Sequence, residues 1–429
     1  MEQTFTVRDS SFLAHSFDWD FRDADTKEGT HVIHSYPAMM IPQVARHLIA
    51  WLRQLHPEAQ TLLDPFCGAG TVLVEAARQR LEAWGNDLNP LAVRIARART
   101  TPIDDDPLLS QLSALDNRLT PLALATWEGP IPTFPGQDFW FKPTVVRALA
   151  FVAANIGEIA HANVRNLAWM AFSETVRWVS NTRNSEFKLY RLAPHKLAAW
   201  NPDVLAVFRE TLARYAEGVR AFSPELRQAP IAPRIVSSDA CELSGVPDGY
   251  FDLMVTSPPY GDSRTTVAYG QFSRLSLEWL GVPSTEARAI DRRLLGGKAS
   301  STPANALPSP TLQAALAEIA HQDGRRAREV ETFYQDVDRA IAAITRKLKP
   351  GALCGWVVAN RTVKRVVLPT DQIIAELSSA RHYTVVDNLV RNIPNKRMPL
   401  ANSPSNVVGD TGATMTKEHL LILRYHGGP

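Results

Sequence analysis

The sequence has few of the features that mark secreted, metal-binding or membrane proteins. Its 429 residues include only three cysteines, Cys67, Cys241 and Cys354, which are too few and too scattered for a disulfide framework or a zinc site. No segment approaches the roughly 20 consecutive apolar residues of a membrane span. The first residues, MEQTFTVRDSSFLAHSFDWDF, lack the basic-then-apolar plan of a signal peptide. We therefore expect a cytoplasmic protein without a bound metal.

A large excess of charge of one sign is also missing. The net charge is only +2, so composition alone does not require a nucleic-acid partner. The positive residues are nevertheless clustered after the midpoint, in the runs RRLLGGK (292–298), GRRAR (324–328), RKLK (346–349), NRTVKR (360–365) and NKR (395–397). Such runs are usually solvated helix faces, and the alternative interpretation is a shared basic groove.

Strands and helices alternate in the first hundred residues. TLLD (61–64) is a short apolar run, GAG (68–70) follows it, and TVLVEAARQRL (71–81) then places apolar residues at helical spacing. AWGND (83–87) predicts a second strand that ends in an acidic residue, and LNPLAVRIARART (88–100) predicts a second helix. This βαβα unit indicates a parallel α/β sheet.

The alternation lapses between residues 101 and 233, where the apolar spacing predicts a largely helical insertion. It resumes with the strands PRIVSSDA (233–240) and FDLMVTSPPY (251–260), and the chain closes with a helix and two paired strands. We therefore divide the chain into a covering element with the first half of the α/β domain (1–100), the insertion (101–233) and the second half of the α/β domain (234–429), which includes a flexible insertion near 281–330.

Three acidic residues stand at predicted strand ends, namely Asp64, Asp87 and Asp239. Ligands of parallel sheets lie outside the carboxyl ends of the strands, near the point where the strand order reverses. Gly68 and Gly70 let the backbone pass close to a ligand and present the N-terminus of the next helix. Asp87 follows the glycine turn at the distance that suits ribose hydroxyls, and Asp239 suits an adenine amino group. Because the third glycine of the dinucleotide fingerprint is missing, the pattern favours S-adenosylmethionine over NAD.

The stretch TSPPY (256–260) ends its strand with two prolines, which cannot donate ladder hydrogen bonds. It resembles the Asp-Pro-Pro-Tyr or Ser-Pro-Pro-Tyr signature of amino-methyltransferases that act on nucleic-acid bases, and its serine form resembles the N4-cytosine DNA methyltransferases. Three more segments resemble the cofactor loop, the ribose-binding segment and the covering element of this family: DPFCGAGT (64–71), GNDLNPLA (85–92) and HSYPAMMIPQVARHLI (34–49). Met39 and Met40 depart from the covering element, which usually has Lys and Phe. The resemblance covers roughly half the chain.

The resemblance implies a Rossmann-like methyltransferase fold, with a mainly parallel seven-stranded sheet, an antiparallel closing strand and, in this chain, the helical insertion. It also implies S-adenosylmethionine as the cofactor. The cofactor-binding residues expected from it are Tyr36, Pro37, Asp64, Pro65, Phe66, Gly68, Gly70, Thr71, Asp87, Leu88, Asp239, Ala240 and Thr256.

The resemblance likewise implies that Ser257, Pro258, Pro259 and Tyr260 are catalytic. An exocyclic base amine is a poor nucleophile because its lone pair is delocalised into the ring. Hydrogen bonds to the Ser257 hydroxyl and the Pro258 carbonyl pull the nitrogen toward sp³ geometry, and the prolines hold that carbonyl rigid. Tyr260 is expected to stack on a base rotated out of the duplex.

DNA-contacting residues are expected in three loops. SNTRNSEFKLYR (180–191) contributes Arg183 and Lys188, and the segment that follows TSPPY contributes Arg264 and Tyr269. A basic loop nearer the C-terminus contributes Lys396 and Arg397, although this loop is as easily an ordinary hairpin.

These observations favour a site-specific enzyme that makes N4-methylcytosine in double-stranded DNA, in a restriction–modification or related host-marking system, with a cognate endonuclease or defence component as a further partner. N6-adenine methylation stays open, because the same pocket holds an adenine amine. An RNA amino-methyltransferase is a third interpretation, although no RNA-binding domain is recognisable. A catalytically silent binding subunit comes from a different class, and the intact TSPPY and cofactor loops argue against it.

Overall fold

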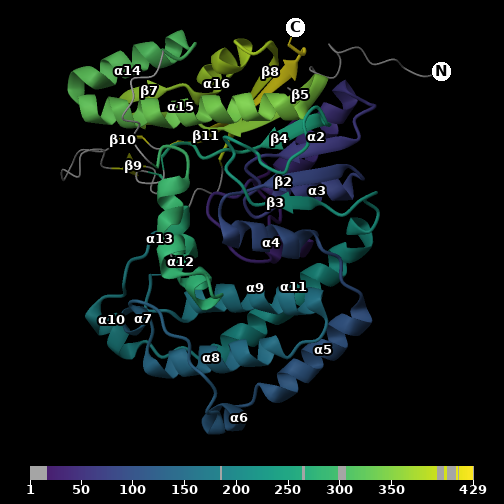
Figure 1. The fold of residues 1–429 in the computed structure, drawn as a ribbon, viewed down its shortest axis with the longest axis vertical. Coiled ribbons are helices and arrows are strands. Elements are labelled where there is room, and N and C mark those ends of the chain that lie inside the picture. The colour runs from purple at the N-terminus through teal and green to yellow at the C-terminus, as the bar shows by residue number, and fades with distance from the viewer. Residues whose placement is uncertain are drawn as a thin grey trace.

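The computed structural model describes residues 17–183, 186–262, 266–297, 306–393, 401–402, 412–413 and 415–428. Its centre is a seven-stranded sheet in the order β3-β2-β1-β4-β5-β11-β8 (Figure 1). These strands span Arg234–Val236 (β3), Glu82–Asn86 (β2), Thr61–Asp64 (β1), Phe251–Thr256 (β4), Leu348–Val358 (β5), Lys417–Tyr425 (β11) and Tyr383–Asn392 (β8). Neighbours pair in parallel except at β11, which is antiparallel to both β5 and β8. The expected methyltransferase fold is confirmed.

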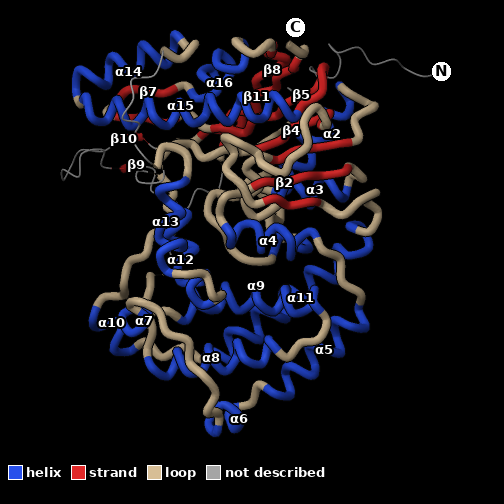
Figure 2. The backbone as a smooth tube through the Cα atoms, viewed as in Figure 1, coloured by secondary structure: helices blue, strands red, loops and turns tan. Residues whose placement is uncertain are grey.

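Helices cover both faces of the sheet, because successive strand residues point to opposite sides. Leu62 and Leu253 pack against one layer of helices, whereas Leu63 and Met254 pack against the other. The first layer consists of α2 (Pro42–Leu55) and α3 (Thr71–Arg78), and the second of α14 (Pro310–Gln322), α15 (Gly324–Lys347) and α16 (Thr370–Ser379). Figure 2 shows the strands enclosed by these helices. The central strands are thus buried on both faces, as their apolar sequences predict.

The insertion between β2 and β3 is helical, as expected, and forms a body below the sheet in Figure 1. Its helices are α5 (Asp105–Arg118), α6 (Pro121–Thr126), α7 (Gln137–Trp140), α8 (Pro143–Gly157), α9 (Ala162–Val179), α10 (Pro194–Ala199) and α11 (Val204–Leu226). The turn η1 (Gly29–Val32) and helix α4 (Pro90–Thr100) pack between this body and the sheet.

Two helices from the second half of the chain also belong to the helical body. They are α12 (Tyr269–Trp279) and α13 (Ser284–Arg293), which follow the TSPPY loop. Phe272 and Trp279 of α12 share one apolar cluster with Phe141 and Phe172 of the insertion. Because α12 follows the TSPPY loop and packs into the helical body, this loop is linked directly to that body (Figure 1).

Two small sheets complete the described structure, β6 (Arg361–Val363) with β7 (Val366–Leu368) and β9 (Ala401–Asn402) with β10 (Gly412–Ala413). None of the described helices is both long and apolar enough to cross a membrane.

A single groove built from all five basic runs is wrong. Lys347 ends α15 directly before β5 and Lys349 lies at the start of β5, whereas Ser257 lies just past the end of the parallel strand β4. Their ammonium groups pair with Asp248 and Asp252, at 2.6 and 2.8 Å. The run at 346–349 therefore stabilises the opposite edge of the sheet from the TSPPY loop.

Candidate active site

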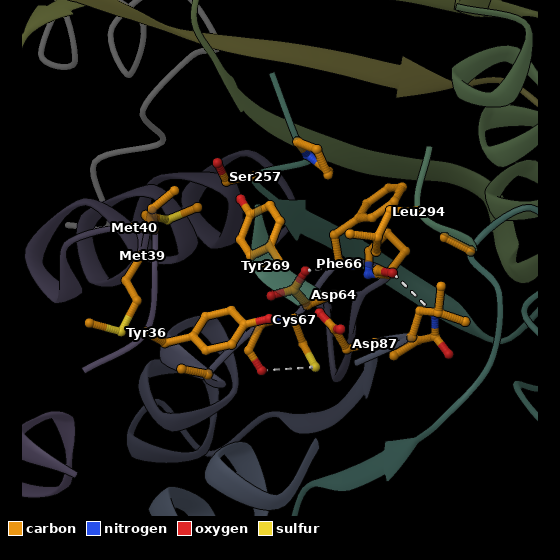
Figure 3. A pocket seen from close by; sticks show the side chains of 18 of the residues that line it. Tyr36, Met39, Met40, Asp64, Phe66, Cys67, Asp87, Ser257, Tyr269 and Leu294 are labelled. Atoms are coloured by element: carbon orange, nitrogen blue, oxygen red, sulfur yellow. Dashed lines mark hydrogen bonds between the residues drawn. The ribbon is translucent and has the colours of Figure 1, made fainter. Parts of the chain in front are cut away.

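The carboxyl ends of three neighbouring strands meet at one cavity (Figure 3). Asp64 ends β1, Asp87 follows β2 and Ser257 follows β4, and all three side chains line this cavity. Because the chain order runs outward in both directions from β1, the cavity lies at the point where strand order reverses. The expected cofactor residues that line it are Tyr36, Pro37, Asp64, Pro65, Phe66, Gly68, Thr71, Asp87, Leu88, Asp239 and Ala240.

The two other expected cofactor residues stand behind this lining. Gly70 has φ +82°, and a Cβ at this position would lie 2.9 Å from the Cβ of Ala96 in α4. A side chain at position 70 is therefore excluded both by the backbone conformation and by the packing of α4. Thr256 donates a hydrogen bond of 2.6 Å from its hydroxyl to Asp64, so it fixes the carboxylate without lining the cavity.

The two carboxylates in the cavity are held by the backbone around them. Asp87 accepts hydrogen bonds from the Gly68 amide at 2.9 Å and the Asn89 amide at 2.7 Å. Burial nevertheless raises the pKa of Asp87 to about 6. Burial also raises the pKa of Asp64 to about 7, and the charge of Asp87 adds to this shift. Two buried carboxylates make the cavity suitable for a ligand with hydroxyl donors and positive charge.

An aromatic pair forms another wall. The ring of Tyr36, from the covering segment, stacks on the ring of Tyr269 at the start of α12, with centroids 5.8 Å apart and planes at 28°. Asn89 donates to the Tyr36 hydroxyl at 3.0 Å and to Ser273 at 2.7 Å. Met39 and Met40, which depart from the family pattern, line the same cavity beside this pair. The covering segment and α12 are thus joined at the cavity.

Another wall, formed by the end of α13, was not predicted from the sequence. Arg293, Leu294 and Leu295 line the cavity, although we interpreted their segment only as a basic run. The chain turns there because Gly296 adopts φ +69° and its amide donates to Asp336 at 2.8 Å. The glycine pair that follows the two leucines was the available signal for this turn.

The TSPPY loop places two of its four expected catalytic residues on the cavity wall, Ser257 and Pro259. Pro258 is buried, and Tyr260 is half-buried against the helices of the second layer. The hydroxyls of Ser257 and Tyr260 lie 3.1 Å apart, and Tyr260 donates to Glu418 of β11 at 3.0 Å. Burial, followed by the charge of Glu418, raises the pKa of Tyr260 well above its usual value. The phenol therefore keeps its proton.

A buried ion cluster fixes the residues just after this loop. Asp262 pairs with Arg326 at 3.0 Å and with Arg361 at 3.6 Å, and all three side chains are largely buried. A Cβ at Gly261 would collide with the Arg361 guanidinium, so a side chain here would require this buried, ion-paired arginine to move. Two of the basic runs, at 324–328 and 360–365, thus contribute cations that hold the loop in place.

The expected DNA-contacting residues divide into three groups. Arg183 and Lys188 lie in the loop after α9, where Leu189 donates its amide to Gln271 of α12 at 3.3 Å. Tyr269 lines the cavity, as described above. Arg264, Lys396 and Arg397 lie outside the described residues.

Comparison with known proteins agrees with this geometry. A family model described as D12 class N6 adenine-specific DNA methyltransferase matches residues 46–119. Over nearly its whole length, the chain is 42% identical to the type II methyltransferase M.MvaI of Kocuria varians, in an alignment of 421 residues that covers 94% of this chain and 93% of the relative. The chain belongs to the type II DNA methyltransferases. Family and fold together imply S-adenosylmethionine as the methyl donor of this methyltransferase.

Two further comparisons are more distant. The type II methyltransferase M.MjaII of Methanocaldococcus jannaschii is 30% identical over 111 residues, which cover 25% of this methyltransferase and 20% of the relative. Among solved structures, the rRNA methyltransferase aviRa from Streptomyces viridochromogenes covers 95% of this chain and 93% of its own, with 13% identity and a TM-score of 0.33. A structural likeness this weak carries no argument.

The cavity of this type II methyltransferase fits the implied donor. Asp87 presents a carboxylate beside the glycine turn, a position where it could accept hydrogen bonds from the hydroxyls of a ribose. Asp64 presents a second carboxylate, which favours a cationic group. The walls between them are apolar and aromatic, from Phe66, Leu294 and Tyr269.

Proposed function

We propose that this methyltransferase modifies the exocyclic N4 amine of a cytosine in double-stranded DNA. The observation that carries the proposal is the position of Ser257, a hydroxyl at the start of a Pro-Pro-Tyr loop, in the same cavity as Asp64 and Asp87. A type II relative over nearly the whole chain supports DNA as the substrate and a restriction–modification system as the setting, with a cognate endonuclease as a further partner.

We propose distinct roles for the three strand-end aspartates. Asp87 accepts from the ribose hydroxyls, Asp239 accepts from the adenine amine, and Asp64 faces the positively charged end of the cofactor. S-adenosylmethionine, when bound, supplies a methyl group from its sulfonium, so the amine nitrogen gains a carbon, the sulfonium becomes a thioether and one proton leaves the nitrogen. Tyr36 and Tyr269 exclude water from this region by their stacked rings.

The residues of the TSPPY loop make the amine nitrogen of the base a better nucleophile. The Ser257 hydroxyl and the Pro258 carbonyl accept its hydrogen bonds, which withdraws the nitrogen lone pair from the ring. Pro259 cannot donate a backbone hydrogen bond and holds the loop rigid. Because the reaction requires access to an amine inside the duplex, the target base is rotated out of the helix and enters the cavity beside Ser257. The stacking role expected for Tyr260 is less favoured, because its ring does not line the cavity.

N6-adenine methylation is the second candidate, because the matching family model is described as N6 adenine-specific. Its match ends at residue 119, so it covers β1, β2 and the cofactor half of the cavity but not the TSPPY loop. The half of the site that meets the base is therefore not part of that match. The serine at position 257 remains the reason to favour cytosine.

We further propose that the helical body reads the target sequence. The loop after α9 exposes Arg183, Phe187 and Tyr190, and it contacts α12, whose first residue lines the cavity. Cations and aromatic rings beside the mouth of the cavity suit phosphate and base contacts. Burial raises the pKa of Asp291 in α13, and the nearby cation of Lys188 partly opposes this shift, so the loop lies close to α13 as well as to α12.

Identification of the modified nucleoside tests the proposal. Duplex DNA with random sequence is incubated with the purified protein and isotope-labelled S-adenosylmethionine, digested to nucleosides and analysed by mass spectrometry. We expect N4-methylcytidine in its deoxy form to carry the label. Labelled N6-methyladenine instead would establish the second candidate, and DNA that carries no label on either base amine would exclude both.

A further inference from the structure

Glu418 completes a hydrogen-bonded chain that begins at the Ser257 hydroxyl. Tyr260 lies 3.1 Å from Ser257 and donates to Glu418 at 3.0 Å, and the second oxygen of Glu418 accepts from Arg391. Only Ser257 of these four residues lines the cavity. None of the sequence motifs includes Glu418 or Arg391, so nothing about the TSPPY signature itself assigns them a role.

The topology of the sheet explains why Glu418 reaches this place. It is the second residue of β11, and β11 runs antiparallel to its neighbours. The start of β11 therefore lies at the edge where the parallel strands end, beside the TSPPY loop. Arg391, near the end of β8, is the direct cross-strand neighbour of Glu418. Arg391 is 5% exposed and also donates to the carbonyl of Trp19 at 2.9 Å, so it is fixed from two sides.

The number of protons on each group determines which group donates in each of these hydrogen bonds. The Arg391 guanidinium has only hydrogen-bond donors, so the Trp19 carbonyl and the Glu418 carboxylate that it contacts must both accept. An ionised glutamate has only acceptors and meets this requirement. Tyr260 commits its single proton to Glu418. The phenol oxygen can then only accept from Ser257, because each hydroxyl has one proton. Ser257 consequently donates away from the cavity, and its lone pairs face the cavity.

We propose that Glu418, held by Arg391, is a positioning residue that turns the lone pairs of Ser257 toward the amine of the target base. An amine offers N–H donors, so it needs an acceptor at Ser257 rather than a second donor. The Ser257 hydroxyl alone is free to rotate and presents either its proton or its lone pairs. Glu418 removes this ambiguity through Tyr260. The inference rests on the proposed methylation of a base amine and deepens it.

The Glu418→Gln substitution tests the direction without changing the size of the side chain. Arg391 demands an acceptor, so the glutamine carbonyl turns to Arg391 and its NH₂ group to Tyr260. Tyr260 then donates to Ser257, and Ser257 donates into the cavity, against the amine. We expect the single-turnover methylation rate to fall about 10–100-fold, as for a misaligned reacting group, while affinity for S-adenosylhomocysteine stays within about twofold. Glu418→Asp, which keeps the charge, is expected to retain more activity than Glu418→Gln.

A double-mutant cycle separates this role from simple stabilisation. Tyr260→Phe interrupts the chain, so Glu418→Gln should have no further effect on the rate in the Tyr260→Phe background. Asp338→Asn is the matched control, because Asp338 forms a bidentate pair with Arg381 at 2.7 and 2.8 Å away from the site. This control should cost stability and leave the rate unchanged.

Nuclear magnetic resonance gives a readout that does not depend on turnover. In protein labelled with ¹³C at tyrosine Cζ, the signal lost in Tyr260→Phe identifies Tyr260, and Glu418→Gln should shift this signal because the phenol loses its carboxylate acceptor. Three results overturn the inference: a parental rate in Glu418→Gln, an equal loss in both backgrounds, or an unmoved Tyr260 signal. A different result would overturn the proposed function, namely a parent enzyme that yields no methylated base amine.

Discussion

Tyr36 and Tyr269 stack their rings across the cavity, although one precedes the first strand of the sheet and the other begins α12. Asn89, within the ribose-binding segment, holds the Tyr36 hydroxyl and also contacts Ser273 of α12. The cofactor cavity is therefore built from the covering segment, the α/β sheet and the helical body together. If the helical body reads DNA, as proposed above, binding of the methyl donor and recognition of DNA share structural elements.

The first prediction concerns this pair. Tyr269→Ala removes one ring of the stack and opens the cavity wall, so it should weaken S-adenosylhomocysteine binding by about 0.5–1.5 kcal/mol, the range for an aromatic pair. Tyr190→Ala is the control, because Tyr190 is an exposed ring in the loop after α9 and does not line the cavity. Isothermal titration calorimetry without DNA should show a loss for Tyr269→Ala alone. Equal affinity of the two variants would place Tyr269 outside the cofactor site.

The second prediction concerns the buried carboxyl of Asp64 and its pKa of about 7, raised from 3.8. Between these two values the folded protein holds the proton that the unfolded chain has lost, so Asp64 makes folding less favourable as pH rises from about 4 to about 7. Asp64→Asn keeps an acceptor for Thr256 and carries no charge. It should raise the free energy of unfolding by on the order of 2–4 kcal/mol at pH 8 and have little effect at pH 4.

Urea unfolding in the absence of cofactor measures this effect, and Asp252→Asn provides a control of opposite sign. The pKa of Asp252 is lowered by its hydrogen bond from Lys349 and by backbone amides, against burial, which raises it. Its ionised form therefore stabilises the fold above pH 4, and Asp252→Asn should destabilise the protein at both pH 5 and pH 8. A gain from Asp64→Asn that is independent of pH would show that ionisation of Asp64 is not its source.

The third prediction concerns the loop after α9. Replacing Arg183 and Lys188 with alanine should reduce the slope of log affinity for duplex DNA against log salt by about 2, if each cation neutralises one phosphate. Lys349→Ala, at the opposite edge of the sheet, should leave the slope unchanged. Fluorescence anisotropy at several salt concentrations gives the slopes. An unchanged slope in the double variant would show that Arg183 and Lys188 do not contact DNA phosphates.

The fourth prediction concerns Ser257 itself. Ser257→Ala removes the acceptor proposed for the base amine and leaves Asp64 and Asp87 in place, so the affinity for the cofactor should hold. The single-turnover rate should fall by on the order of 10²–10³, as after loss of one group that stabilises a transition state. Rapid-quench kinetics with labelled cofactor would measure the rate. Methylation at the parental rate would reduce the TSPPY stretch to a strand terminator.

Much of this architecture was predictable because its determinants are local. Asp64, Gly68 and Asp87 lie within short segments where an apolar strand, a glycine turn and an amphipathic helix follow one another, and such patterns specify both the elements and their junctions. The mainly parallel sheet and the helical insertion followed from the same alternation, and both are confirmed.

The remaining parts depend on packing that no local pattern expresses. Leu294 reaches the cavity because the chain turns at Gly296, whose amide donates a hydrogen bond to Asp336 of α15. This hydrogen bond joins segments that are distant in the sequence. Lys349 stands in a basic run like the others, but its position at the start rather than the end of a strand sends it to the far edge. Glu418 meets Tyr260 only because β11 runs against its neighbours.

The place of β11 also sets an order of events during synthesis. This strand lies between β5 and β8, yet it is the last of the seven to leave the ribosome. Until it inserts, β5 and β8 have no partner between them, and the hydroxyl of Tyr260 has no carboxylate. Before this strand is in place, the sheet therefore lacks one of its inner strands, and the hydroxyls of Ser257 and Tyr260 lack the carboxylate of Glu418. The complete chain of hydrogen bonds that links Ser257, Tyr260, Glu418 and Arg391 can form only once this strand is in place.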